Sequence, residues 1–182
     1  NFAVDGLNLT LRDNEVFGLL GENGAGKSTA LQMICGNLEP TSGNIYIAGY
    51  RVNGGSFREL ARSRQYIGVC PQFDILFDNL TVEEHLLFFS RLRGVSILKE
   101  RAHVKQIIED VGLEEARRRI ASKLSGGMKR RLSIAIALVG DPYVVFLDEP
   151  TSGLDPASRR GVWEIVMSAR KNRCIVLTTH SM

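Results

Sequence analysis

The chain has 182 residues, which is enough for one domain with its own hydrophobic core. Its formal net charge of +3 at pH 7 is too small to indicate nucleic acid or an anionic membrane as a partner. No apolar run approaches the roughly 20 residues of a membrane-spanning helix, and Cys35, Cys70 and Cys174 follow neither a metal-site nor a disulfide spacing. We therefore expect free thiols in a reducing compartment.

The first quarter of the sequence predicts a strand, loop and helix in succession. Residues 6–11 alternate apolar and polar side chains, which is typical of a half-buried edge strand. Residues 15–21 form a nearly continuous apolar run, as expected of a buried central strand. Residues 27–35 place apolar side chains at helical spacing, and Gly36 is positioned to end that helix.

The remainder alternates strands with helices and contains one long helical stretch. Further strands are expected at residues 44–49, 66–70, 143–149 and 174–180. The pattern from 81 to 139 is almost entirely helical and opens with a capping box, Thr81 with Glu84, and another helix is expected at 156–169. This order predicts an α/β fold, mainly a parallel sheet flanked by helices, with an inserted helical subdomain.

A phosphate-binding loop is the most specific local pattern. "GENGAGKS" (residues 21–28) matches G-x-x-x-x-G-K-[ST] and lies between a predicted strand and a predicted helix. In such a loop the backbone N–H groups converge on phosphate oxygens, Lys27 bridges the β and γ phosphates, and Ser28 offers its hydroxyl to Mg²⁺. An accidental glycine turn is the alternative. The expected phosphate-binding residues are Gly21, Glu22, Asn23, Gly24, Ala25, Gly26, Lys27, Ser28 and Thr29.

Two acidic residues end the predicted strand "VVFLDE". Asp148 is placed to serve as a Mg²⁺ carboxylate, and Glu149 can reach a water in line with the γ phosphate as a general base. Without the loop upstream, acidic residues that simply end a strand in solvent would be the favoured interpretation.

Four further motifs accompany these two. They are "CPQ" ending in Gln72, "LSGG" from Leu124 to Gly127, "SGLD" ending in Asp155, and "TTH" ending in His180. Together, in this order, they resemble the ATP-binding domain of ABC transporters over essentially the whole chain. The resemblance implies a P-loop NTPase fold with an antiparallel β edge, and ATP and Mg²⁺ as cofactors.

The resemblance also implies individual roles. Gln72 would contact Mg²⁺ and the attacking water and would face the membrane domain, His180 would contact the γ phosphate, and Asp155 would belong to a loop that touches the opposite subunit. Taken singly, Gln72 could be an ordinary loop amide, Asp155 a helix N-cap before Pro156, and His180 a surface residue. His180 follows a buried strand at the edge of the sheet where ligands of open α/β folds gather.

The glycines of "LSGG" leave a helix start with bare N–H groups. Because residues 21–28 already surround the phosphates of one nucleotide, this helix start is expected to face the nucleotide of a second copy in a head-to-tail dimer. The residues concerned are Leu124, Ser125, Gly126, Gly127 and Met128.

We expect a single ATP-binding domain over residues 1–182, truncated at both ends because it lacks an initiator Met and stops at a helix-start signal. Its RecA-like core with the β edge would comprise residues 1–72 and 141–182, and the helical subdomain residues 73–140. The adenine-stacking aromatic residue of the family would lie before Asn1.

Longer segments, "GVCPQFDILFDNLTVEEHL" and "LSGGMKRRLSIAIALVGDP" among them, resemble the A subfamily of eukaryotic ABC proteins, which are mostly lipid exporters or flippases. This resemblance implies ATP-driven lipid transport at the cytoplasmic face of a membrane, with transmembrane domains as partners. The clusters "KRR" and "RRR" are interpreted as solvated helix faces, so no nucleic-acid partner is expected. A soluble ABC-type ATPase acting on nucleic acid or ribosomes is the alternative, and a noncatalytic half a weaker one.

Overall fold

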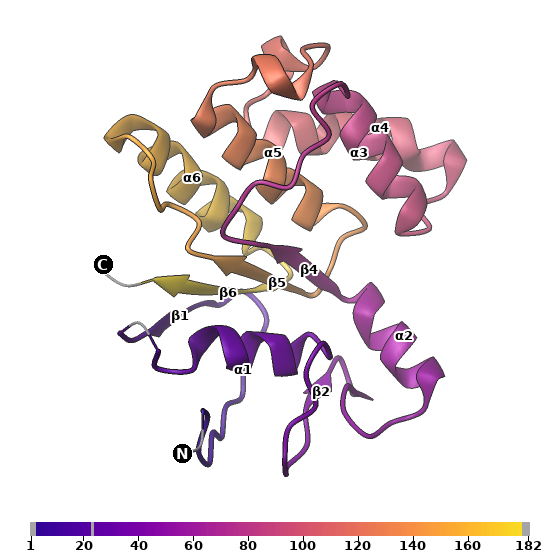
Figure 1. Ribbon diagram of the computed structural model, residues 1–182. Coiled ribbons are helices and arrows are strands. Elements are labelled where there is room, and N and C mark those ends of the chain that lie inside the picture. Colours follow the sequence, from indigo (N-terminus) through magenta and orange to yellow (C-terminus); the bar gives the residue numbers. More distant parts are fainter. Residues whose placement is uncertain (1–2, 23, 180–182) are drawn as a thin grey trace.

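The structure is a computed structural model that describes residues 3–22 and 24–179 (Figure 1). Within this part of the chain, a four-stranded parallel sheet lies at the centre with the order β1-β6-β5-β4. Its strands are β1 (Val16–Leu20), β4 (Ile67–Cys70), β5 (Val144–Asp148) and β6 (Cys174–Thr179). An antiparallel pair, β2 (Tyr46–Ile47) and β3 (Tyr50–Arg51), forms a separate two-stranded sheet.

Helices cover both faces of the parallel sheet (Figure 1). Helix α1 (Lys27–Ile34) lies on one face together with the β2–β3 pair, while α5 (Gly126–Leu138) and α6 (Pro156–Ala169) lie on the other. Farther from the sheet, α3 (Val82–Leu92) and α4 (Ile97–Asp110) pack against α5, and α2 (Phe57–Gln65) leads into β4. Two 3₁₀ turns, Glu114–Ala116 and Ala121–Lys123, connect α4 to α5. The expected α/β fold is confirmed.

The two faces of the sheet belong to two hydrophobic clusters, because successive strand residues point to opposite sides. On β5, Val145 and Leu147 belong to the cluster that contains buried residues of α3, α4, α5 and α6. Phe146 belongs to the other cluster, with Leu31 of α1 and Val176 of β6. Burial of a side chain such as Phe146 contributes about 1.5–3 kcal/mol to stability. Near-continuous apolar strands are therefore what this sheet needs.

Two strand predictions require correction. Residues 6–11 form no strand, and Leu7 and Leu9 are 51% and 41% exposed. Alternation alone does not make a strand, because the backbone also needs a neighbouring strand with which to form hydrogen bonds. Here the side-chain amide of Asn8 donates to the nearby carbonyl oxygen of Gly6. The strand expected at 44–49 is present only as Tyr46–Ile47.

Helix α2 and strand β3 were not predicted from the sequence. Helix α2 contains only three apolar residues, Phe57, Leu60 and Ala61, and Ser56 and Glu59 form a capping box at its start. The capping box predicted for α3 is confirmed: Oε2 of Glu84 accepts from the N–H of Thr81 at 2.8 Å. No helix in residues 3–22 and 24–179 combines the length and the apolar character needed to cross a bilayer.

Candidate functional site

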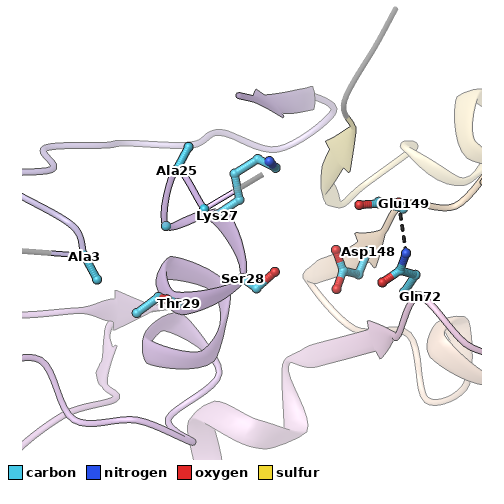
Figure 2. A pocket seen from close by; sticks show the side chains of 10 residues that line it. Ala3, Ala25, Lys27, Ser28, Thr29, Gln72, Asp148 and Glu149 are labelled. Atoms are coloured by element: carbon cyan, nitrogen blue, oxygen red, sulfur yellow. Dashed lines mark hydrogen bonds between the residues drawn. The ribbon is translucent and has the colours of Figure 1, made fainter. Parts of the chain in front are cut away.

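A cavity of about 470 Å³ lies between the phosphate loop and the carboxyl ends of two other strands (Figure 2). In Figure 2 the loop and the start of α1 form one side, and the side chains of Gln72, Asp148 and Glu149 form the other. The cavity is lined by Ala3, Gly24, Ala25, Gly26, Lys27, Ser28, Thr29, Gln72, Asp148 and Glu149. The structure thus brings together three segments that are far apart in the sequence.

The phosphate loop has the curled backbone that its glycines allow. Gly24 and Gly26 both have φ of 84°, in the left-handed region that favours glycine. A Cβ at Gly26 would lie 2.0 Å from the carbonyl oxygen of Ala3, so no larger residue fits there. Gly26 also caps α1 without a side-chain hydrogen bond, which leaves the first N–H groups of the helix to an anion.

Lys27 places a cation beneath this loop. Its side chain is folded back, and Nζ donates to the carbonyl oxygens of Gly21 at 2.6 Å and Glu22 at 2.9 Å. The residue is only 8% exposed, so its charge is held close to the helix start. Positive potential therefore collects on the loop side of the cavity, opposite two carboxylates.

The carboxylate side is organised by Thr178 of β6. The Cα atoms of Asp148 and Thr178 are partners across the β5–β6 ladder. The Thr178 hydroxyl donates to Oδ1 of Asp148 at 2.5 Å and accepts the N–H of Glu149 at 3.0 Å. Glu149 has φ of 43°, a strained conformation for a residue other than glycine. The threonine therefore holds both acidic residues.

Gln72 and Glu149 are joined directly. Nε2 of Gln72 donates to Oε2 of Glu149 at 3.0 Å, which is the interaction drawn as a dashed line in Figure 2. This contact leaves the amide oxygen of Gln72 available as an acceptor or metal ligand on the cavity side. The expected grouping of Gln72 with the two acidic residues is what the structure shows.

The predicted "LSGG" residues lie outside this cavity. Ser125 caps α5, and its hydroxyl accepts the N–H of Met128 at 3.3 Å. Ser125 and Gly126 are exposed at the helix start, whereas Leu124 and Gly127 are buried. These positions are compatible with a surface that meets a second molecule.

Asp155 also lies outside the cavity, as the N-cap of α6. Oδ1 of Asp155 accepts the N–H groups of Ala157 and Ser158, each at 3.0 Å. Hydrogen bonds from Ser158, followed by that from Ala157, lower the pKa of Asp155. The capping interpretation is confirmed. Of the other expected site residues, Asn23 and His180 lie outside the described residues.

Two residues near the cavity escaped the sequence analysis. Thr178 lies two positions before His180 in "TTH", where it could have been noticed as a hydroxyl at the end of a buried strand. Arg130 donates to the main chain on both sides of Glu149. The interpretation of "KRR" as a solvated helix face is wrong for Arg130, which is buried, because the composition of this segment does not reveal the distant carbonyls to which its guanidinium donates.

The comparison with protein families decides which family these features represent. The sequence model described as "ABC transporter" matches residues 4–152, which is most of the chain. The chain belongs to the ABC transporter family.

Curated members of this family are similar over 180 residues, or 99% of this chain. The human phospholipid-transporting ATPase ABCA3 is 48% identical, and the human retinal-specific phospholipid-transporting ATPase ABCA4 is 47% identical. The mouse ATP-binding cassette sub-family A member 7 is 46% identical. The chain spans 10%, 8% and 8% of the length of these relatives, respectively.

Solved structures of ABC proteins share the fold. CbiO1 from Clostridium perfringens, part of the cbiONQ ABC transporter complex, is 31% identical with a TM-score of 0.89, over 98% of this chain and 72% of that one. An ATP-binding cassette solved as a dimer in a post-hydrolysis state, bound to ADP and Pi, is 27% identical with a TM-score of 0.84, over 98% of this chain and 80% of that one.

Proposed function

We propose that this chain binds and hydrolyses ATP as the nucleotide-binding domain of a transporter. The observation that carries the proposal is the cavity itself, in which a glycine loop with Lys27 faces Asp148, Glu149 and Gln72. Positive potential on one side suits a polyphosphate, and the acidic side suits a metal ion and an attacking water. The post-hydrolysis relative bound to ADP and Pi supports this assignment.

Mg²⁺ fits the oxygen donors that line the cavity from its two sides. Hard divalent cations prefer oxygen ligands, and Ser28, Asp148 and Gln72 offer a hydroxyl, a carboxylate and an amide carbonyl that line the same cavity. Thr178 occupies one Asp148 oxygen and thereby orients the carboxylate. When bound, the ion would neutralise charge on the phosphates.

Glu149 is proposed as the general base that accepts a proton from the attacking water. Its carboxylate lines the cavity, and Gln72 orients it through the hydrogen bond to Oε2. Gln72 would also position the water, and His180 would contact the γ phosphate. Together they would act on the nucleotide held by the phosphate loop.

The helix start at Ser125–Met128 is proposed to contact the nucleotide of a second ATP-binding domain in a head-to-tail dimer. Gly126 is exposed at the start of α5 and is not among the described residues that line the chain's own cavity. The loop of Asp155 would touch the same partner. The dimeric state of one solved relative supports this arrangement. Loss of the γ phosphate would weaken the closed dimer and so couple hydrolysis to motion.

Transport of a phospholipid or another hydrophobic substrate is the proposed role of the whole protein, at the cytoplasmic face of its membrane. Two of the relatives above are phospholipid-transporting ATPases. Membrane-embedded partner domains would dock beside Gln72, where Phe73, Ile75 and Phe77 expose their side chains. We keep the division into a core, residues 1–72 and 141–182, and a helical subdomain, residues 73–140, as part of this proposal.

The test uses the full-length protein reconstituted in phospholipid vesicles, with Lys27→Ala as the variant and the exposed Lys171→Ala as the control. We expect ATP hydrolysis in the wild type and the control, and impaired ATP binding or turnover in Lys27→Ala. Absence of ATP binding by the wild type, or normal binding and turnover by Lys27→Ala, would overturn the proposal.

A further inference from the structure

Arg130 is a buried arginine that reaches from α5 to the main chain behind Glu149. It is 3% exposed. Its Nε donates to the carbonyl oxygen of Pro150 at 2.9 Å, and its Nη2 donates to the carbonyl oxygen of Asp148 at 2.8 Å. These two carbonyls belong to the residues immediately before and after Glu149. One guanidinium therefore holds the backbone on both sides of the proposed base.

The third guanidinium nitrogen holds the segment that carries Gln72. Nη1 of Arg130 donates to the carbonyl oxygen of Pro71 at 2.7 Å and to that of Gln72 at 3.2 Å. It also lies 3.3 Å from Oδ1 of Asp74. Since Gln72 donates through its side chain to Glu149, the two residues are linked twice, once directly and once through Arg130.

We infer that Arg130 is a positioning residue for ATP hydrolysis, which sets the geometry of Glu149 and Gln72 through their main chains. The inference rests on the proposed function. Glu149 has φ of 43°, and a strained backbone persists only where its surroundings hold it. Arg130 of α5 and Thr178 of β6 supply those contacts.

The chemistry of arginine explains why this residue type is needed. A guanidinium presents five N–H donors in a rigid plane, so it can serve four carbonyls in two segments at once. A lysine ammonium has the same charge but only three donors on one atom. Arg130→Lys thus keeps the positive charge but weakens the hydrogen bonds that hold the four carbonyls in place.

Arg130 also belongs to the helix that begins at Gly126, the start proposed to face a second nucleotide. A shift of α5 would move the guanidinium, and with it the carbonyls around Glu149. The position of α5 is therefore coupled to the geometry of Glu149 by direct contacts.

The first experiment measures nucleotide affinity and turnover of Arg130→Lys in the full-length protein. A misplaced base lowers kcat more than binding, so we expect kcat per bound nucleotide to fall at least about 10-fold, with the Kd for ATP changed less than about threefold. Arg131→Lys is the matched control: it makes the same change on the same helix, but Arg131 bonds to the carbonyl of Gly112, outside the cavity. The control should keep both constants near those of the wild type.

The second experiment separates positioning from a general structural role. Arg130→Lys is combined with Glu149→Gln, and residual hydrolysis is measured in single turnover. If Arg130 acts through Glu149, the added substitution should change the residual rate less than about twofold, because the effects are not additive. An equal fractional loss in both backgrounds would overturn the inference.

Two further outcomes are decisive. Wild-type kcat in Arg130→Lys would overturn the inference, while slow turnover of Glu149→Gln in the same series would leave the proposed function intact. Should Arg130→Lys fail to fold, Arg130→Gln replaces it in both experiments. The amide serves fewer carbonyls, so the same loss of kcat and the same non-additivity are expected.

Discussion

Nε2 of Gln72 donates to Oε2 of Glu149 across 3.0 Å, although the two residues are 77 positions apart. Gln72 follows β4 and Glu149 follows β5, and these strands are neighbours in the parallel sheet. Two loops that leave the same edge of a sheet thus supply one pair of functional groups, as open α/β folds commonly do.

Glu149→Gln should stop ATP turnover while nucleotide binding persists. The amide cannot accept the proton of the attacking water, and loss of a general base typically costs about 10²–10⁴-fold in kcat. Single-turnover hydrolysis and binding of labelled ATP by the full-length protein would measure both. Robust hydrolysis by this variant would contradict the assignment of Glu149.

Thr178→Val should lower both stability and turnover. The change keeps the shape of the side chain but removes the hydroxyl that accepts from the N–H of Glu149 and donates to Oδ1 of Asp148, and loss of such bonds costs about 1–3 kcal/mol for a buried group. Urea unfolding and kcat are the measurements. Thr178→Ser retains the hydroxyl and should restore most of both; equal behaviour of the Val and Ser variants would refute this role.

Gly127→Ala should destabilise the fold, whereas Gly126→Ala should not. An added Cβ at Gly127 would lie 2.3 Å from Oγ and 2.9 Å from Cβ of Ser158, while nothing lies within 4 Å of the position at Gly126. Overpacking of this kind costs about 1–3 kcal/mol. Thermal unfolding would show the difference, and adding Ser158→Gly to Gly127→Ala should recover stability because it removes both contacting atoms.

Glu84→Gln should have a pH-dependent effect on stability. Hydrogen bonds from the N–H and hydroxyl of Thr81 lower the pKa of Glu84 below its usual 4.5. A lowered pKa in the folded state means that the carboxylate stabilises the protein above pH 4.5 and loses this effect as the pH falls through the folded-state value. The difference in the free energy of unfolding between the wild type and Glu84→Gln should shrink in acid. The exposed Glu115→Gln serves as the control.

The three cysteines should resist alkylation in the folded protein at pH 8. Burial raises the pKa of Cys35 and Cys174 to about 11 and that of Cys70 to about 12, so little thiolate forms. Mass spectrometry of labelled peptides would show modification only after denaturation. Rapid labelling of Cys70 without denaturant would contradict its buried position.

Local patterns predicted the bends before α1 and the acidic end of β5. The bends at Gly24 and Gly26 and the helix start at Lys27 follow a local glycine pattern, so the sequence reports them directly. Thr178 and Arg130 act on residues 30 and 18 positions away, and nothing near them in the chain marks those partners. Periodicity cannot find such contacts.

The same distinction explains the errors in the fold. Residues 6–11 have a strand pattern but no ladder, which only the folded chain decides. Helix α2 contains few apolar residues, and its clearest sequence signal was the capping box of Ser56 and Glu59. The order of the strands likewise depends on contacts between distant segments.

Strand β6 has a consequence for how the domain is made. In the part of the chain that the structure describes, β1 pairs only with β6, although 153 residues separate Leu20 from Cys174 (Figure 1). During synthesis β1 must wait for β6, since parallel pairing over such a distance forms late. A ribosome-bound chain that ends before residue 174 therefore carries a sheet in which β1 has not yet paired with β6. Chaperone capture should be greatest at that length.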